Sequence, residues 1–333
     1  MRASISAKRH ERESGCTMAQ TDAVKTEKER RILPVVGTDM FLPITVVHGQ
    51  HPGKCVVLSA GVHSREYIGI EALLRCADRI RSEDVCGTIV LLPCCNYRGF
   101  IRRSGDVVPA DGKNLNRAFP GSADGTATQK LAAFLQEKII PGADYMIDLH
   151  SGGFCEELIP HCYYHGAAEA SVCARSYRLA QLTSPRYLVR SCVTNGFYSY
   201  AGQCGVPAIL LERGGCGLLQ EAEVEADVAD VMNILRGTGV LCDAPAIEYT
   251  HTDIRLGHYE NAPCSGCWYP RKQPGDRIQK NEILGEIRTI YGDTRCIVHA
   301  RADGVILYQT VSLGIEENTP MVAYGAVERE QHL

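Results

Sequence analysis

The sequence predicts an α/β protein with a mixed, mainly parallel sheet flanked by helices, followed by a small all-β domain. Two observations predict this fold class. Over residues 31–243, short apolar runs alternate with segments of helical periodicity, which is typical of buried parallel strands joined by helices. Over residues 244–333, apolar and polar positions alternate between Gly and Asp turns, which indicates short antiparallel strands. A chain of 333 residues is long enough for one large and one small domain.

The predicted strands and helices of the large domain follow from this pattern. A helix is expected after the first strand, because Ile70, Leu73, Leu74, Ala77 and Ile80 recur at steps of three and four residues. A second helix is expected over 129–139. Since ligand-binding and catalytic sites of such sheets form at the carboxyl ends of strands, a functional site is expected at those ends. The four apolar strands are expected at 54–61, 87–95, 144–150 and 207–213.

The amino-terminal segment, the absence of long apolar runs and the net charge exclude several classes of protein. Residues 1–30 are rich in charge and poor in apolar spacing, so we expect a flexible arm, with Met18 as a second candidate start. There is no signal peptide pattern and no apolar run of membrane-spanning length, which predicts a cytoplasmic protein without a membrane partner. A formal charge of -4 gives no basic field for nucleic acid. A homo-oligomer is the default expectation for a soluble protein of this kind.

The sequence contains 16 cysteines, and we expect them to be reduced thiols. They are about 5% of the residues, below the roughly 8–10% that marks a disulfide scaffold. Cys94 and Cys95 follow an apolar run and are expected to be buried. Cys264 and Cys267 form a CxxC, but no second pair lies at the spacing of a structural zinc site, so ordinary thiols are favoured.

Four titratable residues stand at the predicted strand ends. His63 and Glu66 follow the first strand, His150 ends the third and Glu212 ends the fourth. Each alone is more often a hydrogen-bonded loop residue, but the four together favour a site. His and Glu three residues apart, completed by a distant His, form the ligand set of hydrolytic zinc sites, in which a fourth position stays open.

Asp148 and Glu212 each have two interpretations. Asp148 points to the same side of the strand as His150 and could orient its imidazole, or it could simply cap the strand end. Glu212 follows the apolar run AILL, where a carboxylate needs a partner or a purpose. It could be a general base beside the metal, or it could form an ion pair with Arg213.

The motifs HxxE, NLNRAFPG, DLHSGG and LLERGG occur in this order, and the chain over about 33–330 resembles the succinylglutamate desuccinylase/aspartoacylase family of the zinc carboxypeptidase-like superfamily. The resemblance implies one zinc ion and hydrolysis of the amide bond of a small N-acylated amino acid or amine. It implies these roles: His63, Glu66 and His150 as zinc ligands, Glu212 as general base and acid, Asn116 and Arg117 as substrate-carboxylate ligands, and Arg103, with Arg102 as its alternative, as the group that polarises the scissile carbonyl.

Two other functions stay open at this point, namely a metallocarboxypeptidase acting on short peptides and a non-catalytic zinc-binding protein. The C-terminal part is similar to the barrel-sandwich domain of biotinyl and lipoyl carriers, but its turn RADG has no lysine to modify. We therefore expect it to cap the mouth of the site. His161, His165, Tyr198 and Tyr200 are candidates for the pocket lining, although simple packing is the favoured interpretation for each.

Overall fold

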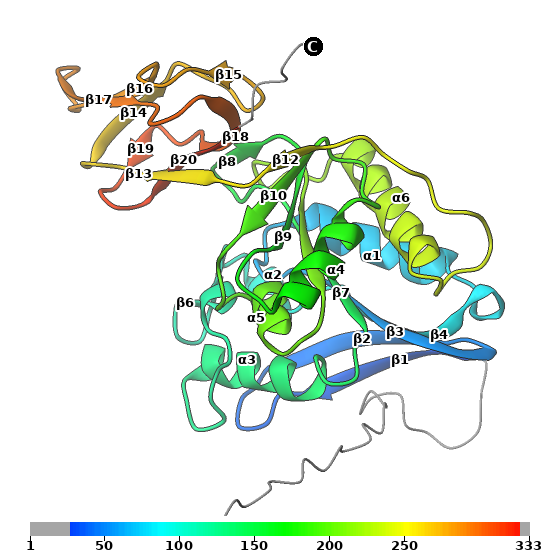
Figure 1. Ribbon diagram of the computed structural model, residues 1–333. Coiled ribbons are helices and arrows are strands. Elements are labelled where there is room, and N and C mark those ends of the chain that lie inside the picture. The colour runs from blue at the N-terminus through cyan, green and yellow to red at the C-terminus, as the bar shows by residue number, and fades with distance from the viewer. Residues whose placement is uncertain (1–26, 327–333) are drawn as a thin grey trace, which may run out of the picture.

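The structure is a computed structural model that describes residues 27–326 (Figure 1). Its centre is a nine-stranded mixed sheet. In sheet order the strands are β1 (Glu27–Pro34), β2 (Phe41–His48), β4 (Cys86–Leu92), β3 (His51–Ala60), β7 (Tyr145–His150), β11 (Ala208–Glu212), β9 (His161–His165), β10 (Tyr187–Ser191) and β12 (Thr252–Ile254). Five of the eight neighbouring pairs are parallel, so the predicted mixed, mainly parallel sheet is confirmed.

The four strands expected from apolar runs are β3, β4, β7 and β11, and all four lie together in the middle of the sheet. The predicted arm is wrong for residues 27–30, which belong to β1 and pair antiparallel with β2. A two-stranded edge of this kind is held by backbone hydrogen bonds, and its charged side chains carry no apolar pattern. The rest of the predicted arm, Met18 included, lies outside the described residues.

Helices cover both faces of the sheet. One face packs against α1 (Tyr67–Arg79), α4 (Ala170–Ala180) and α6 (Glu221–Gly237), and the other against α3 (Ala127–Lys138) and α5 (Phe197–Gln203). The predicted stripe of α1 is buried except for Leu74, which is 46% exposed because it lies beside the contact line. Helix α3 begins after Thr126, whose backbone N–H donates to the Gln129 side chain at 3.0 Å.

The chain between the first strands and α3 is irregular and contains short elements. These are η1 (Ser82–Asp84), α2 (Tyr97–Arg102), the hairpin β5 (Val107–Val108) and β6 (Lys113–Asn114), and η2 (Leu115–Arg117). Within residues 27–326, no helix has both the length and the apolar character of a membrane span.

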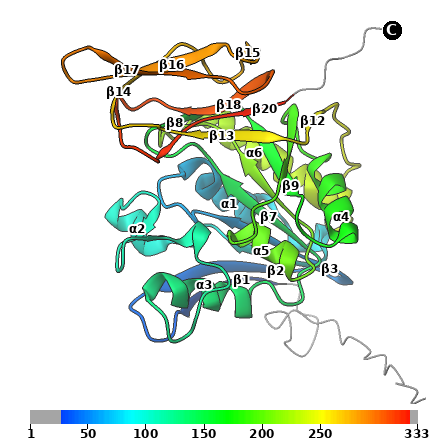
Figure 2. The same ribbon diagram turned by 60° about the vertical axis from the view of Figure 1, so that its left-hand side comes forward.

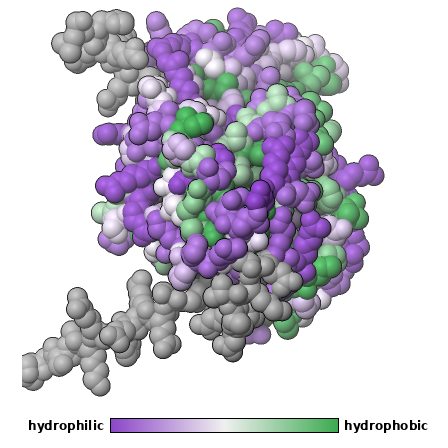
Figure 3. All heavy atoms as spheres, turned by 90° about the vertical axis from the view of Figure 1, so that its right-hand side faces the viewer, coloured by the Kyte–Doolittle hydropathy of each residue, from purple (hydrophilic) through white to green (hydrophobic). Residues whose placement is uncertain are grey.

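The face at the right of Figure 1 is mostly hydrophilic, with apolar residues in separate small patches (Figure 3).

Residues 257–325, named here the C-terminal β region, form two small antiparallel sheets. One contains β13 (Gly257–Asn261), β20 (Pro320–Gly325), β18 (Gly304–Thr310) and β15 (Arg277–Ile278); the other contains β17 (Thr294–His299), β16 (Ile283–Arg288), β14 (Gly266–Pro270) and β19 (Gly314–Ile315). Trp268 and Tyr324 are buried in its own apolar core. Strand β8 (Glu156–Leu158) pairs with β18, so backbone hydrogen bonds join the C-terminal β region to the segment that follows β7 (Figure 2).

All fifteen cysteines of the described residues are free thiols. Cys94 and Cys95 are buried as predicted, and burial raises the pKa of the Cys94 thiol to about 12. The described part of the chain therefore relies on apolar packing rather than on covalent cross-links.

Candidate active site

The turn between β3 and α1 holds the first two predicted ligands. It begins at Gly61, where φ is +63° and a Cβ would lie 3.0 Å from the Cys94 backbone, so only glycine fits easily. The Glu66 N–H donates to the His63 carbonyl, which closes the turn just before α1. This local fold brings His63 Nδ1 to 2.7 Å from Glu66 Oε1.

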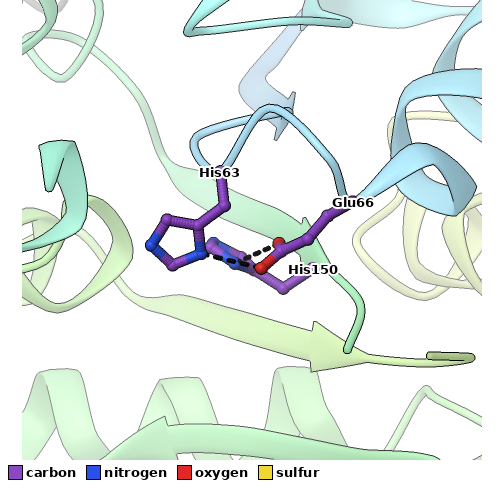
Figure 4. A group of neighbouring side chains, drawn as sticks. All are labelled: His63, Glu66 and His150. Atoms are coloured by element: carbon purple, nitrogen blue, oxygen red, sulfur yellow. Dashed lines mark hydrogen bonds and ion pairs between the residues drawn. The ribbon is translucent and has the colours of Figure 1, made fainter. Parts of the chain in front are cut away.

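His150 reaches the same point from the end of β7. Its Nδ1 lies 2.7 Å from Glu66 Oε2, so the Glu66 carboxylate stands between the two imidazoles (Figure 4). One nitrogen or oxygen from each residue can be chosen so that all three atoms lie within 4.8 Å of one another. Among the residues that the structure describes, His63, Glu66 and His150 are the one group with this arrangement.

The outward nitrogens of both imidazoles have acceptors beside them. His150 Nε2 lies 3.2 Å from Asp148 Oδ2, and His63 Nε2 lies 3.1 Å from Asn114 Oδ1. Asp148 is itself held by the Ser59 hydroxyl, which donates to Oδ1 at 2.6 Å. Acceptors of this kind fix the tautomer and ring orientation of metal-binding histidines, so the donor set and its surroundings fit zinc.

The electrostatics of this group favour charge separation in the metal-free state. Burial opposes charge on all three side chains, but their mutual attraction outweighs it. The histidines hold the pKa of Glu66 to about 2, and the Glu66 carboxylate raises the pKa of His63. The pKa of His150 is raised well above its usual range, because both Glu66 and Asp148 lie beside it. A cation in this place would replace the protons on the two imidazoles.

Glu212 ends β11 next to this group. In the parallel register of β11 and β7 it stands opposite His150. Burial raises the pKa of Glu212 well above the usual value, and the nearby Glu66 and Glu156 charges add to the shift, while His150 opposes it. The alternative ion pair with Arg213 is not formed. The Arg213 guanidinium instead binds Asp227 at 3.0 Å and Asp230 at 2.5 Å, both on α6.

A cavity of about 260 Å³ opens over these residues. Besides His63, Glu66, His150 and Glu212, its lining includes acidic, cationic, amide, hydroxyl and apolar side chains: Asp106, Asn114, Asn116, Arg117, Ser151, Glu156, Leu158, Tyr163, Ser191, Val193, Tyr198, Ser199, Leu210, Tyr259, Tyr308 and Pro320, together with Gly196. Tyr259, Tyr308 and Pro320 come from the C-terminal β region, so that region forms one wall of the pocket.

The structure brings Asn116 and Arg117 to the pocket but leaves Arg103 outside it. Asn116 is buried and its Oδ1 accepts the Phe197 N–H at 2.9 Å, which leaves the amide nitrogen as its donor. Arg103 is exposed, takes the left-handed conformation that ends α2, and its carbonyl accepts from Arg65. Neither Arg102 nor Arg103 lines the cavity, so the expected placement of this arginine is corrected.

Several lining residues were missed from the sequence. Asp106 precedes β5 and Asn114 ends β6, so a two-strand hairpin too short to show periodicity presents both. Glu156 follows DLHSGG closely, and this nearness to His150 was a usable signal. Of the four candidate lining residues, Tyr198 lines the pocket, whereas His161 and His165 are buried and Tyr200 lies elsewhere.

Comparison with known proteins defines the class of protein first. Residues 52–238 match the Succinylglutamate desuccinylase/Aspartoacylase catalytic domain, and this stretch exceeds half of the chain. The chain belongs to the succinylglutamate desuccinylase/aspartoacylase family, whose named relatives are deacylating hydrolases. The family expected from the four motifs is thereby confirmed.

Individual relatives agree with this assignment. The chain is 36% identical over 152 residues to the N-alpha-acetyl-L-2,4-diaminobutyric acid deacetylase of Halomonas elongata, a stretch that covers 45% of this chain and 43% of that enzyme. A succinylglutamate desuccinylase from Silicibacter sp. TM1040 is 27% identical with a TM-score of 0.78, covering 87% of this chain and 89% of that one. The product-bound ectoine utilization protein EutE (DoeB) of Ruegeria pomeroyi shares the fold, with 24% identity and a TM-score of 0.82 over 92% of this chain and 98% of that one.

Proposed function

We propose that this protein is a zinc-dependent deacylase that hydrolyses the amide bond of a small N-acylated amino acid, and that its substrate class is an N-acetylated diamino acid. One observation carries the proposal. A single pocket holds the His63, Glu66 and His150 group, the protonatable Glu212, and a lining in which acidic side chains outnumber cations.

In the proposed hydrolysis of the amide bond, the metal-binding residues and Glu212 have different roles. Zinc held by His63, Glu66 and His150 would supply Lewis acidity toward a water molecule and the scissile carbonyl. Glu212 takes a proton from the attacking water and gives it to the leaving amine nitrogen. Its raised pKa suits the first step, because a carboxylate with a raised pKa is a stronger base toward the water proton.

The charges of the pocket select the substrate. Arg117 is the sole Arg or Lys among the lining residues of the described chain, so the pocket offers a guanidinium for one carboxylate. Asp106 and Glu156 also line the pocket, and neither forms an ion pair with the described residues. A Cβ on Gly153 would lie 3.5 Å from both Asp106 Oδ1 and Glu156 Oε2, so the two carboxylates border the same side of the pocket, and Glu156 Oε2 also accepts the Gly153 N–H at 3.2 Å. Two neighbouring carboxylates without a cation suit an ammonium group.

A substrate with one carboxylate and one ammonium satisfies this arrangement. N-acetyl-2,4-diaminobutyrate has this charge pattern, and the Halomonas elongata relative is named for it. Succinylglutamate carries three carboxylates and no ammonium, so the acidic side chains would repel it. The small cavity also favours an acylated amino acid over a peptide, which leaves the metallocarboxypeptidase as the second candidate.

The proposal also includes the division of the chain into two domains. We propose that residues 31–243 act as the catalytic unit and that residues 244–333 cap the pocket through Tyr259 and Tyr308. The cytoplasmic location and the homo-oligomer stay predictions.

The test measures amine release from N-α-acetyl-2,4-diaminobutyrate, N-acetylalanine, N-acetylaspartate, N-succinylglutamate and a dipeptide by the zinc-loaded protein. We expect the acetylated diamino acid to have the highest kcat/KM. In an Asp106→Asn/Glu156→Gln variant, KM for that substrate should rise at least about tenfold, the scale of one lost charged contact. KM for N-acetylalanine, which has no ammonium group, should change little in this variant.

The control is Glu157→Gln, which neutralises an exposed neighbour of Glu156. It should behave as wild type on every substrate. Preference for N-succinylglutamate would contradict the diamino acid, cleavage confined to the dipeptide would favour the carboxypeptidase, and no release from any compound with zinc bound would refute the deacylase.

A further inference from the structure

Two thiols far apart in the sequence lie in contact on the surface. Cys86 is the first residue of β4, and Cys242 follows the end of α6. Their Sγ atoms are 3.2 Å apart. Figure 1 shows the start of β4 and the end of α6 side by side at the right of the view.

The backbone holds the two cysteines in place. Val85 and Leu241 form an isolated antiparallel bridge. On either side of it, the Cys86 N–H donates to the Val240 carbonyl at 2.8 Å, and the Cys242 N–H donates to the Asp84 carbonyl at 3.1 Å. Since each cysteine is one residue from the bridged pair, both side chains leave on the same face of the bridge. A disulfide needs Sγ atoms about 2.0 Å apart, so the two sulfurs, now 3.2 Å apart, must approach each other by about 1 Å.

Accessibility separates this pair from the buried thiols. Cys242 is exposed and Cys86 is half-buried, whereas Cys76, Cys94 and Cys95 are shut inside the apolar core. Burial raises the pKa of Cys76 to about 12 and shuts out reagents, whereas the pKa of Cys242 is raised chiefly by its hydrogen bond with Cys86 and not by exclusion from solvent. Cys192 and Cys204 are exposed as well, so what distinguishes Cys242 among the exposed thiols of the described residues is the second thiol in contact with it.

We propose that Cys86 and Cys242 are a redox modification site, at which a low-molecular-weight disulfide such as oxidised glutathione is the oxidant and a reversible intramolecular disulfide is the product. The Cys242 thiolate attacks one sulfur of the small disulfide, whose S–S bond breaks and releases one small thiol. The Cys86 thiolate then attacks Cys242 Sγ and displaces the second small thiol. Two electrons pass from the cysteines to the small disulfide, and their two protons end on the two released thiols.

The bond would stabilise the fold without touching the pocket. It lies at the amino end of β4, whereas the pocket lies at the carboxyl ends of the parallel strands β3, β7 and β11. It closes a loop from 86 to 242 that contains both His150 and Glu212, and long loops lose the most unfolded-state entropy when they are closed. Oxidation should therefore raise the melting temperature and leave kcat/KM unchanged.

The test compares the zinc-loaded wild-type chain with Cys86→Ser and with Cys192→Ser, which removes an exposed cysteine outside the pair. Each is treated with oxidised glutathione, the remaining thiols are alkylated, and the peptides are mapped by mass spectrometry. We expect a cross-linked Cys86–Cys242 peptide in wild type and Cys192→Ser, a rise in Tm of about 5 °C or more that dithiothreitol reverses, and neither result in Cys86→Ser.

A stable glutathione adduct on Cys242 of wild type, with no cross-link, would overturn the proposal. So would a cross-link that leaves Tm unchanged or that lowers kcat/KM. Cross-linking and Tm are measured without substrate, so these two outcomes are independent of the deacylase assignment, whereas the kcat/KM outcome rests on it.

Discussion

Glu212 and His150 are direct partners in the parallel register of β11 and β7. Side chains at paired positions of neighbouring strands project to the same face of the sheet, about 5 Å apart. A proposed metal ligand and a protonatable carboxyl are therefore held side by side by the pairing of two strands. This relationship gives the clearest expectations for mutants.

Glu212→Gln should reduce kcat by about 10² to 10⁴, the range for loss of a proton-transfer group. Zinc content should stay at the wild-type level, because the three proposed ligands remain in place. Steady-state kinetics beside metal analysis of the purified variant gives both numbers. Loss of zinc together with activity would make Glu212 a ligand instead of a base.

Asp148→Asn should lower zinc affinity by about 10- to 100-fold, as is usual when the acceptor of a ligand histidine is altered. The reason is that Asp148 Oδ2 lies beside His150 Nε2 and orients the ring. Competition with a chromophoric chelator measures the change. The exposed Asp78→Asn is the matched control, and equal affinities in both variants would mean that Asp148 only caps its strand.

Stability should depend on pH through His161. Burial lowers the pKa of His161 from 6.5 to about 4, so the folded protein keeps this ring neutral while the unfolded chain takes up a proton. The unfolded state binds more protons between about pH 6.5 and 4. The contribution is therefore fully present above pH 6.5 and is lost as the pH falls, up to about 3 kcal/mol.

Urea unfolding of the wild type at pH 7, 6 and 5 measures this trend against His161→Asn. The asparagine amide can replace His161 Nδ1, which lies 2.8 Å from the Ile159 carbonyl, but it does not titrate. The variant should lose part of the pH dependence in this window. The exposed His299→Asn should retain all of it, and identical slopes in the two variants would contradict the assignment.

Arg213→Ala should lower the free energy of unfolding by about 3–5 kcal/mol, because it leaves buried carboxylates without their cation. Asp227 and Asp230 are both fully buried and both bind this guanidinium. Arg236→Ala breaks the more exposed pair with Asp243 and should cost about 1 kcal/mol or less. Equal costs, measured by urea unfolding, would show that the Arg213 cluster adds nothing beyond a surface pair.

The sequence predicts the central strands and the clustering of His63, Glu66, His150 and Glu212 for the same reason. The strands β3, β7 and β11 are continuous apolar runs, and His63, His150 and Glu212 stand at their ends. A run of apolar residues identifies a buried strand, and a polar residue that ends this run must lie at the carboxyl end of the strand. Both inferences need only local sequence.

The rest depends on contacts that local sequence does not encode. The alternating pattern of 257–325 shows which positions face inward, but not that Tyr259 and Tyr308 meet the pocket. Arg102 and Arg103 are adjacent and equally polar, and only the left-handed end of α2 decides where Arg103 lies. The edge strand β1 is specified by its partner β2 rather than by its own residues.

Because β8 pairs with β18, the C-terminal β region lies beside the pocket, and this position affects how relatives can diverge. The residues that match the family domain end at 238, whereas Tyr259 and Tyr308 come later in the chain. The matched stretch contains the proposed metal group and the charged lining residues Asp106, Arg117 and Glu156, whereas one wall of the pocket lies beyond it. Relatives that agree over the matched stretch can therefore still differ in that wall, and so in the size and shape of the molecule that the pocket admits.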